Sequence, residues 1–185
     1  MKKFLSIEQL LIGSITPFLF VFFPQITFAG TQSDQEGITN YLERANYFSV
    51  KDKDSSLFYL QKCIDIYSDP ELTINSEILF NIGNLYHNNG IYDKSLEYFL
   101  KAALCAEKMG DKEMLVHSNN WAGYIYSQLG ETEHAIETLM QNLKYAEQEE
   151  ISEYLSEINL MLGFSYRDFG DNKNAMKYFE SAMNS

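Results

Sequence analysis

Apolar side chains recur at helical spacing along residues 76–185. Leu79, Ile82, Gly83 and Tyr86 fall at i, i+3, i+4 and i+7, which places them on one face of a predicted helix. A second apolar stripe runs over residues 95–102, and Gly90 lies between the two. Gly90 suits the left-handed conformation that ends a helix, because a side chain there would be strained. The pattern predicts a helical hairpin, two antiparallel helices joined by a tight turn.

This hairpin pattern recurs at a constant interval along the chain. Self-similarity at a period of about 40 residues is typical of solenoids, in which each unit buries its apolar face against its neighbours. We therefore predict an all-α solenoid of antiparallel helix hairpins. The positions in register are Gly83, Gly123 and Gly163; Tyr86, Tyr126 and Tyr166; Gly90, Gly130 and Gly170; Ser95, Ala135 and Ala175; and Phe99, Leu139 and Phe179.

Small residues predict where the two helices of a hairpin cross. Gly83 on the first helix and Ser95 on the second leave room for two backbones to approach, while Tyr86 and Phe99 fill the space beside them. A larger side chain at the crossing would force the helices apart, at a typical overpacking cost of about 1–3 kcal/mol. Most of the aromatic side chains are interpreted as core between long helices.

The repeats divide the chain into segments. Residues 31–35 are expected to be a flexible lead, residues 36–69 a degenerate first repeat without a turn glycine, and residues 70–110, 111–149 and 150–185 three further repeats. In the degenerate repeat, residues 41–48 and 56–63 carry the two apolar stripes and residues 49–54 the turn. Asp69 and Pro70 are predicted to start the next helix, as its N-cap and first residue.

Residues 1–30 have the pattern of a secretory signal. Lys2 and Lys3 precede an uncharged run over residues 10–23, and Thr27 and Ala29 supply small side chains before the expected cleavage point. The alternative is an uncleaved anchor, although the run is shorter than the roughly 20 residues that span a bilayer. We expect an exported protein, periplasmic or extracytoplasmic, or attached to the inner membrane if the segment is retained.

The chain is acidic, with a formal net charge of −12 at pH 7. This charge disfavours nucleic acid and anionic membrane surfaces and suits a neutral or basic protein or peptide. The two cysteines, Cys63 and Cys105, lie in apolar patterns of separate predicted helices. We interpret them as buried thiols rather than a disulfide, because geometry decides pairing.

The order Ile82-Gly83, Tyr86, Gly90, Ser95, Phe99 and its later copies resembles the tetratricopeptide repeat (TPR) family over residues 76–185. The family's usual repeat is about 34 residues, so helices about one turn longer are expected here. Asn119 and Asn159 stand where the family prefers a large apolar residue, and Asn142 replaces a small one. The closing proline of the family's motif is absent from these copies.

The resemblance implies a TPR-like superhelix whose first helices line a concave groove. Amides, aromatic rings and few charges at such positions can hydrogen-bond an extended backbone and accept apolar side chains. Taken singly, each of these residues also fits an ordinary solvated helix face. The implied groove residues are Asn84, His87, Asn88, His117, Asn120, Tyr124, Ser127, Phe164 and Arg167, together with Glu77, Phe80, Gln128, Glu157, Leu160 and Asp168.

No catalytic or cofactor motif is visible in the sequence. His87, His117 and His134 lie on three different predicted helices without the paired spacing of a zinc-binding helix. Glycine loops that cradle phosphate and nucleophile elbows are missing as well. We expect a protein that is not an enzyme and needs no cofactor or metal.

Two functional hypotheses remain. The first is an exported adaptor that binds a protein or peptide in its groove. The second is the extracytoplasmic sensory portion of a truncated bacterial sensor kinase or transcriptional regulator. The last predicted helix keeps Phe179, Ala182 and Met183 in repeat phase, so an apolar flank is expected there. Either two chains cover this flank as a homodimer, or the product is a shortened form of a longer one.

Overall fold

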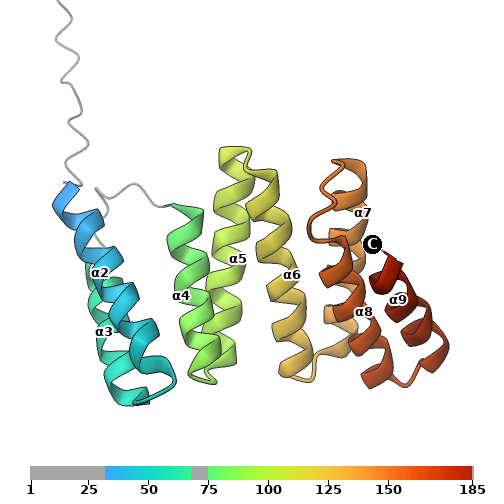
Figure 1. Cartoon of the computed structure of the whole chain (residues 1–185), viewed down its shortest axis with the longest axis horizontal. Coiled ribbons are helices and arrows are strands. Elements are labelled where there is room, and N and C mark those ends of the chain that lie inside the picture. Colours follow the sequence, from blue (N-terminus) through green and yellow to red (C-terminus); the bar gives the residue numbers. More distant parts are fainter. Residues whose placement is uncertain (1–31, 68–74, 185) are drawn as a thin grey trace, which may run out of the picture.

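Antiparallel helix pairs build the protein. The computed structural model describes residues 32–67 and 75–184, and these residues contain helices and no strand. Successive helices stand side by side in chain order, each packed on the next (Figure 1). The predicted all-α solenoid of antiparallel hairpins is confirmed. The pairs are α2 (Gln32–Ser49) with α3 (Lys53–Tyr67), α4 (Ser76–Asn88) with α5 (Tyr92–Met109), α6 (Lys112–Gln128) with α7 (Thr132–Gln148), and α8 (Leu155–Phe169) with α9 (Asn172–Asn184).

The solenoid curves toward its first helices. Helix α2 contacts α4, α4 contacts α6, and α6 contacts α8. Within the described ranges, the second helices α5, α7 and α9 make no such contact with one another. The first helices therefore lie closer together and form the concave side, while the second helices form the convex side.

Glycine marks the crossing of each of the last three helix pairs. A Cβ atom on Gly83 would lie 2.9 Å from Cδ1 of Phe99, and one on Gly123 would lie 2.5 Å from Cγ of Leu139. Gly163 faces Phe179 in the same way. The hydroxyl of Ser95 adds a buried hydrogen bond of 2.9 Å to the carbonyl oxygen of Gly83. The close approach predicted from the small residues is confirmed.

The first pair uses alanine at the same crossing. Ala45 is completely buried, and Ser56 donates a buried hydrogen bond of 2.8 Å to its carbonyl oxygen, as Ser95 does to Gly83. The turn between α2 and α3 spans residues 50–52 and contains no glycine. Helix α2 begins at Gln32, inside residues 31–35, so the prediction of a flexible lead there is corrected. Extending an existing helix fixes one residue per new hydrogen bond, which costs little.

Helix α4 begins at Ser76. Asn75 is its N-cap, and its side-chain oxygen accepts a hydrogen bond of 2.7 Å from the backbone amide of Glu77. Asp69 and Pro70, which we predicted to start this helix, lie outside the described residues, as does the predicted signal of residues 1–30. Among the described helices, none is long and apolar enough to cross a membrane.

Among the described residues, left-handed residues end five helices. Gly90, Gly130 and Gly170 have φ values of 72°, 80° and 91°, so their predicted conformation is confirmed. Two more such positions were not predicted from the sequence. Gly110 ends α5 with φ 72°, and Glu150, at the same position of the next repeat, follows α7 with φ 57°. Glu150 occupies this region as a non-glycine residue, which costs roughly 1–2 kcal/mol.

Replacing Glu150 by glycine should therefore stabilise the protein. We expect Glu150→Gly to raise the free energy of unfolding by about 1 kcal/mol, since glycine adopts the left-handed conformation without strain. Urea denaturation followed by circular dichroism measures this change. The matched control is Glu147→Gly within α7, which should lower the free energy by about 1 kcal/mol through lost helix propensity. A stability loss for Glu150→Gly would contradict the strain argument.

The two cysteines form no disulfide, as predicted. Cys63 is completely buried, and burial raises the pKa of its thiol to about 12. Cys105 is half-buried rather than buried as we had expected.

Thiol alkylation should distinguish the two cysteines by their reactivity. At pH 8 we expect iodoacetamide to modify Cys105 in the native protein, whereas Cys63 should react only after unfolding, because the thiolate is the reactive form. Peptide mass spectrometry of the labelled protein reads out each site. Equal labelling of both cysteines under native conditions would show that α3 opens readily.

Candidate functional site

A groove opens on the concave side between α2, α4 and α6. Its volume is about 450 Å³. Three first helices supply its walls, so it lies where the family resemblance placed a binding surface. The lining residues are Leu42, Glu43 and Asn46 from α2; Asn81, Asn84, Leu85 and Asn88 from α4; and Trp121 from α6.

Four asparagine side chains give this groove its chemistry. Asn81, Asn84 and Asn88 follow one another at i, i+3 and i+7 along one face of α4, and Asn46 faces them from α2. Within the described part of the chain, none of these carboxamides has a hydrogen-bond partner. Each carboxamide can donate two hydrogen bonds and accept two. The groove therefore offers both kinds of hydrogen-bonding group to a polar ligand.

Trp121 forms the rigid end of the groove. Its ring stacks on Phe99, with ring centroids 5.6 Å apart, and meets the rings of His87 and Tyr124 edge-on at 5.4 and 5.7 Å. The indole Nε1–H donates a hydrogen bond of 3.2 Å to Nε2 of His117. Because rings from α4, α5 and α6 hold the indole, its groove-facing edge is fixed in place.

His117 is held between two rings. Phe80 lies 4.2 Å from it and Tyr154 lies stacked at 4.9 Å, measured between ring centroids. Since Nε2 accepts the hydrogen bond from Trp121, the neutral ring carries its proton on Nδ1. Burial lowers the pKa of His117 below its ordinary value of 6.5, and the nearby charge of Glu153 opposes this effect.

Acid should destabilise the protein through His117. The pKa of His117 is lower in the folded protein than in the unfolded chain, so the unfolded chain binds the proton more readily. The contribution of neutral His117 to stability is therefore complete above pH 6.5. It is lost as the pH falls through the pKa of the folded state. We expect the free energy of unfolding to fall between pH 7 and pH 5, and to fall less in His117→Gln. Denaturation at several pH values tests this. An identical pH dependence in both proteins would contradict it.

The carboxyl group of Glu157 gives the stability of the protein the opposite pH dependence, at lower pH than His117 does. Burial raises its pKa above the ordinary 4.5, and the amide of Asn120 opposes this effect. Its contribution to stability is therefore complete below pH 4.5 and is lost as pH rises through the folded pKa.

Several predicted groove residues lie instead between helices. Asn120 is completely buried, and its amide lies close enough to Glu157 to affect the pKa of that carboxyl but forms no regular hydrogen bond with it. The interpretation of Asn120 as an accessible groove residue is therefore corrected, because α6 packs directly against α8 at this point. Ser127 bonds Ser165 across the same two helices, with 2.9 Å between the hydroxyl oxygens. Phe80 is also buried, with 6% of its surface exposed.

The remaining predicted groove residues lie outside this groove, and most of them are on α8. Phe164 is exposed, and the guanidinium of Arg167 lies 5.0 Å above its ring. Arg167 also pairs with Asp168 at 2.7 Å. Leu160 is exposed on α8 and Gln128 at the end of α6, while Glu77 is exposed on α4. The structure thus brings Asn84 and Asn88 into one groove, packs His87 and Tyr124 against its Trp121 wall, and leaves Phe164 and Arg167 on another helix.

Two of the four groove amides, Asn46 and Asn81, were not predicted from the sequence. Asn81 was visible from its spacing, since it shares a helix face with Asn84 and Asn88, and Trp121 occupies the same position in the next repeat. Asn46 and Glu43 lie in the degenerate first repeat, where no glycine sets the register. Among the described residues, no group of three or more histidine, cysteine, aspartate or glutamate side chains is placed to hold a metal ion.

Comparisons with known proteins bear on the fold. The tetratricopeptide repeat family matches residues 76–104, 116–149 and 156–185. A solved structure of MamA is similar with a TM-score of 0.59 and 16% identity, covering 82% of this chain and 80% of that one. A putative kinesin light chain from Podosopora anserina, with nearly identical TPR-like repeats, has a TM-score of 0.64 and 16% identity, covering 82% and 75%. A comparison with curated proteins finds no match.

Proposed function

The chain belongs to the tetratricopeptide repeat family, whose members serve as scaffolds for protein interaction. We propose that it holds an extended segment of a protein partner in its concave groove. In this proposal the protein is a scaffold and has no catalytic chemistry. The observation that carries the proposal is the set of four carboxamides, Asn46, Asn81, Asn84 and Asn88, that line one groove without a hydrogen-bond partner among the described residues.

Carboxamides suit an extended backbone for a physical reason. A peptide in that conformation has N–H and C=O groups that no internal hydrogen bond satisfies, and each amide side chain can bond both kinds. Each such bond contributes about 0.5–1.5 kcal/mol net. Beside them, Leu42, Leu85 and the Trp121 ring offer apolar surface to the partner's side chains. Such a site favours peptide geometry over one particular sequence.

Charge narrows the class of partner. Glu43 is the charged residue that lines the groove, and the chain as a whole carries a net charge of −12. A basic segment is attracted to this surface, a neutral segment is not repelled, and an acidic segment is repelled. Nucleic acid is disfavoured on the same ground.

Site-specific photocrosslinking tests the groove. A photoreactive amino acid placed at Asn88, at the exposed margin of the groove, should capture a partner in cells that produce the protein. The same probe combined with Asn81→Ala and Asn84→Ala should lose most of that product. The control carries Asn40→Ala and Asn172→Ala, which are exposed and lie outside the groove. Equal capture by both versions would overturn the proposal.

We also propose that the protein is exported. The support is the basic start, uncharged run and small residues of positions 2–29. Cell fractionation combined with N-terminal sequencing of the recovered protein checks this. A cytoplasmic protein that retains its first methionine would contradict it.

Self-association through the last hairpin is a further part of the proposal. Met176 and Met183 on α9 are 64% and 78% exposed, whereas Ile136 and Leu143, at the same positions of the preceding repeat, are partly buried. A second copy that covers this face would bury both methionines. Sedimentation at several concentrations should show a dimer that Met183→Glu dissociates. A monomer at every concentration would contradict it.

A further inference from the structure

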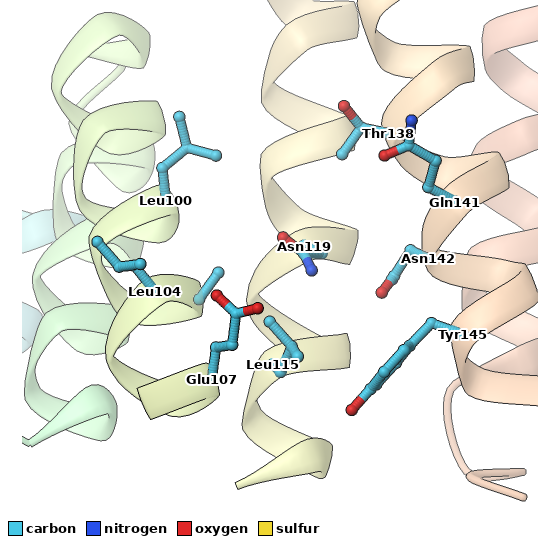
Figure 2. Close-up of a pocket in the computed structure, with 10 residues that line it drawn as sticks. Leu100, Leu104, Glu107, Leu115, Asn119, Thr138, Gln141, Asn142 and Tyr145 are labelled. Carbon is cyan, nitrogen blue, oxygen red and sulfur yellow. The ribbon is translucent and has the colours of Figure 1, made fainter. Parts of the chain in front are cut away.

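The convex side carries a second groove, on the opposite side of the hairpins from the asparagine groove. It lies between α5 and α7, with α6 as its floor, and has a volume of about 440 Å³. Figure 2 shows Leu100, Leu104 and Glu107 on α5, Asn119 on α6, and Asn142 and Tyr145 on α7 around this hollow. It shares no lining residue with the concave groove.

The floor of this groove is polar where the preceding repeat is apolar. Asn119 takes the place of Leu79, which holds the same position one repeat earlier and is 2% exposed. Asn119 has no hydrogen-bond partner in the described part of the chain, so no internal contact accounts for its amide. Asn142 beside it is buried, and its Nδ2 donates a hydrogen bond of 2.9 Å to the carbonyl oxygen of Val116, which ties α7 to α6. This hydrogen bond fixes α7 against the floor of the hollow.

The same groove recurs one repeat later. A hollow between α7 and α9 contains Glu147, Leu155 and Asn159, which hold the repeat positions of Glu107, Leu115 and Asn119 in the first. Lys177 from α9 also lines this second hollow. The first hollow has a carboxylate and no lysine or arginine among its lining residues, so its charge is left for an outside group to balance.

The walls define the shape of an occupant. Leu100, Leu104 and Glu107 lie at i, i+4 and i+7 along one face of α5, and the two leucines are 40% and 51% exposed. This face extends over about two helical turns, or roughly 10 Å. Along the α5 wall, the two leucines offer no hydrogen-bonding group to the backbone of an extended peptide. A helix satisfies its own backbone and needs only side-chain contacts, which is how helices bind in grooves.

From these observations we propose that the groove between α5 and α7 binds an amphipathic helix of a basic protein partner. The helix places a leucine-like side chain against Leu100 and Leu104. One turn further along, a lysine or arginine pairs with Glu107, and the amide of Asn119 bonds the polar end of a neighbouring side chain. The convex groove thus takes a helix, whereas the concave groove is proposed to take an extended segment.

Titration of the ¹⁵N-labelled protein with designed peptides tests this assignment. The probe is a blocked peptide of about four helical turns with leucine and lysine on one face and alanine and glutamine elsewhere. It should shift the backbone amides of residues 100–107 and 138–145. A peptide with glutamate in place of lysine, and one with the same residues scrambled around the helix, should bind at least about tenfold more weakly.

Matched variants locate the site. Leu104→Glu should abolish the shifts, and Leu160→Glu, an equally exposed leucine on the concave helix α8, should leave them unchanged. The Asn81→Ala, Asn84→Ala, Asn88→Ala protein should bind the probe normally, which separates this site from the concave groove. The proposal is overturned if the probe causes no shift up to about 1 mM, if the shifts fall on α4 instead, or if the glutamate peptide binds equally well.

Discussion

Gly123→Leu is expected to lower the free energy of unfolding by about 3 kcal/mol, among the largest effects of any single substitution in this protein. A Cβ at position 123 would lie 2.5 Å from Cγ and 2.7 Å from Cδ2 of Leu139. Cγ is the branch point of that side chain, and Leu139 is completely buried, so it cannot rotate away. Helices α6 and α7 would have to separate. Urea denaturation monitored by circular dichroism measures the loss.

Gly37→Leu is the matched control, because it also replaces a helical glycine. A Cβ at Gly37 would meet only Cδ1 of Ile66, at the ordinary contact distance of 3.5 Å. Here the substitution gains about 1 kcal/mol of helix propensity, and its Cβ meets no clash. A double-mutant cycle of Gly123→Ala with Leu139→Ala should show favourable coupling, since the smaller partner makes room. Equal losses at both glycines would show that helix crossing does not explain the constant spacing of glycine between repeats.

The crossing contacts were predictable because they repeat. Gly83, Gly123 and Gly163 face Phe99, Leu139 and Phe179, and the separation along the chain is the same in all three pairs. That interval depends only on helix geometry and turn length. Glu150 was not predictable in the same way, because glutamate is not a residue that marks a left-handed turn. Its conformation is set by its place in the repeat, which matches that of Gly110, between two helices that are already fixed.

The groove was predictable only in part. The family resemblance implied a concave face that includes Asn84 and Asn88, and both residues line one groove in the structure. Asn120, which the resemblance implied for the same face, holds the repeat position of Phe80 and, like Phe80, is buried. Whether such a side chain is open depends on how closely two first helices approach, which is a property of packing between repeats. Sequence periodicity describes one helix at a time and does not contain that distance.

Trp121 belongs both to the core and to the proposed binding site. From the sequence, the aromatic residues were interpreted as core, and its ring does pack against Phe99, His87 and Tyr124. It also lines the asparagine groove. One side chain therefore links the packing of α4, α5 and α6 to the proposed binding surface, so a change there should affect both stability and partner binding.

Trp121→Ala should lower the free energy of unfolding by about 3 kcal/mol and weaken capture of a partner in the concave groove. Truncation removes the ring contacts to three helices and leaves Nε2 of His117 without its hydrogen bond of 3.2 Å. Differential scanning calorimetry measures the first effect, and crosslinking from Asn88 measures the second at a temperature where the variant is folded.

Trp121→Phe separates ring packing from hydrogen bonding. Phenylalanine keeps one ring near Phe99 but loses the N–H group and part of the indole's packing area, so about 1–2 kcal/mol should be lost. Tyr47→Ala removes an aromatic side chain that is 58% exposed, and should change stability by less than about 0.5 kcal/mol. If Trp121→Phe costs as much as Trp121→Ala, the hydrogen bond to His117 holds the wall of the groove. If Trp121→Ala costs nothing, the rings do not hold α4 against α6, and the groove has no fixed end.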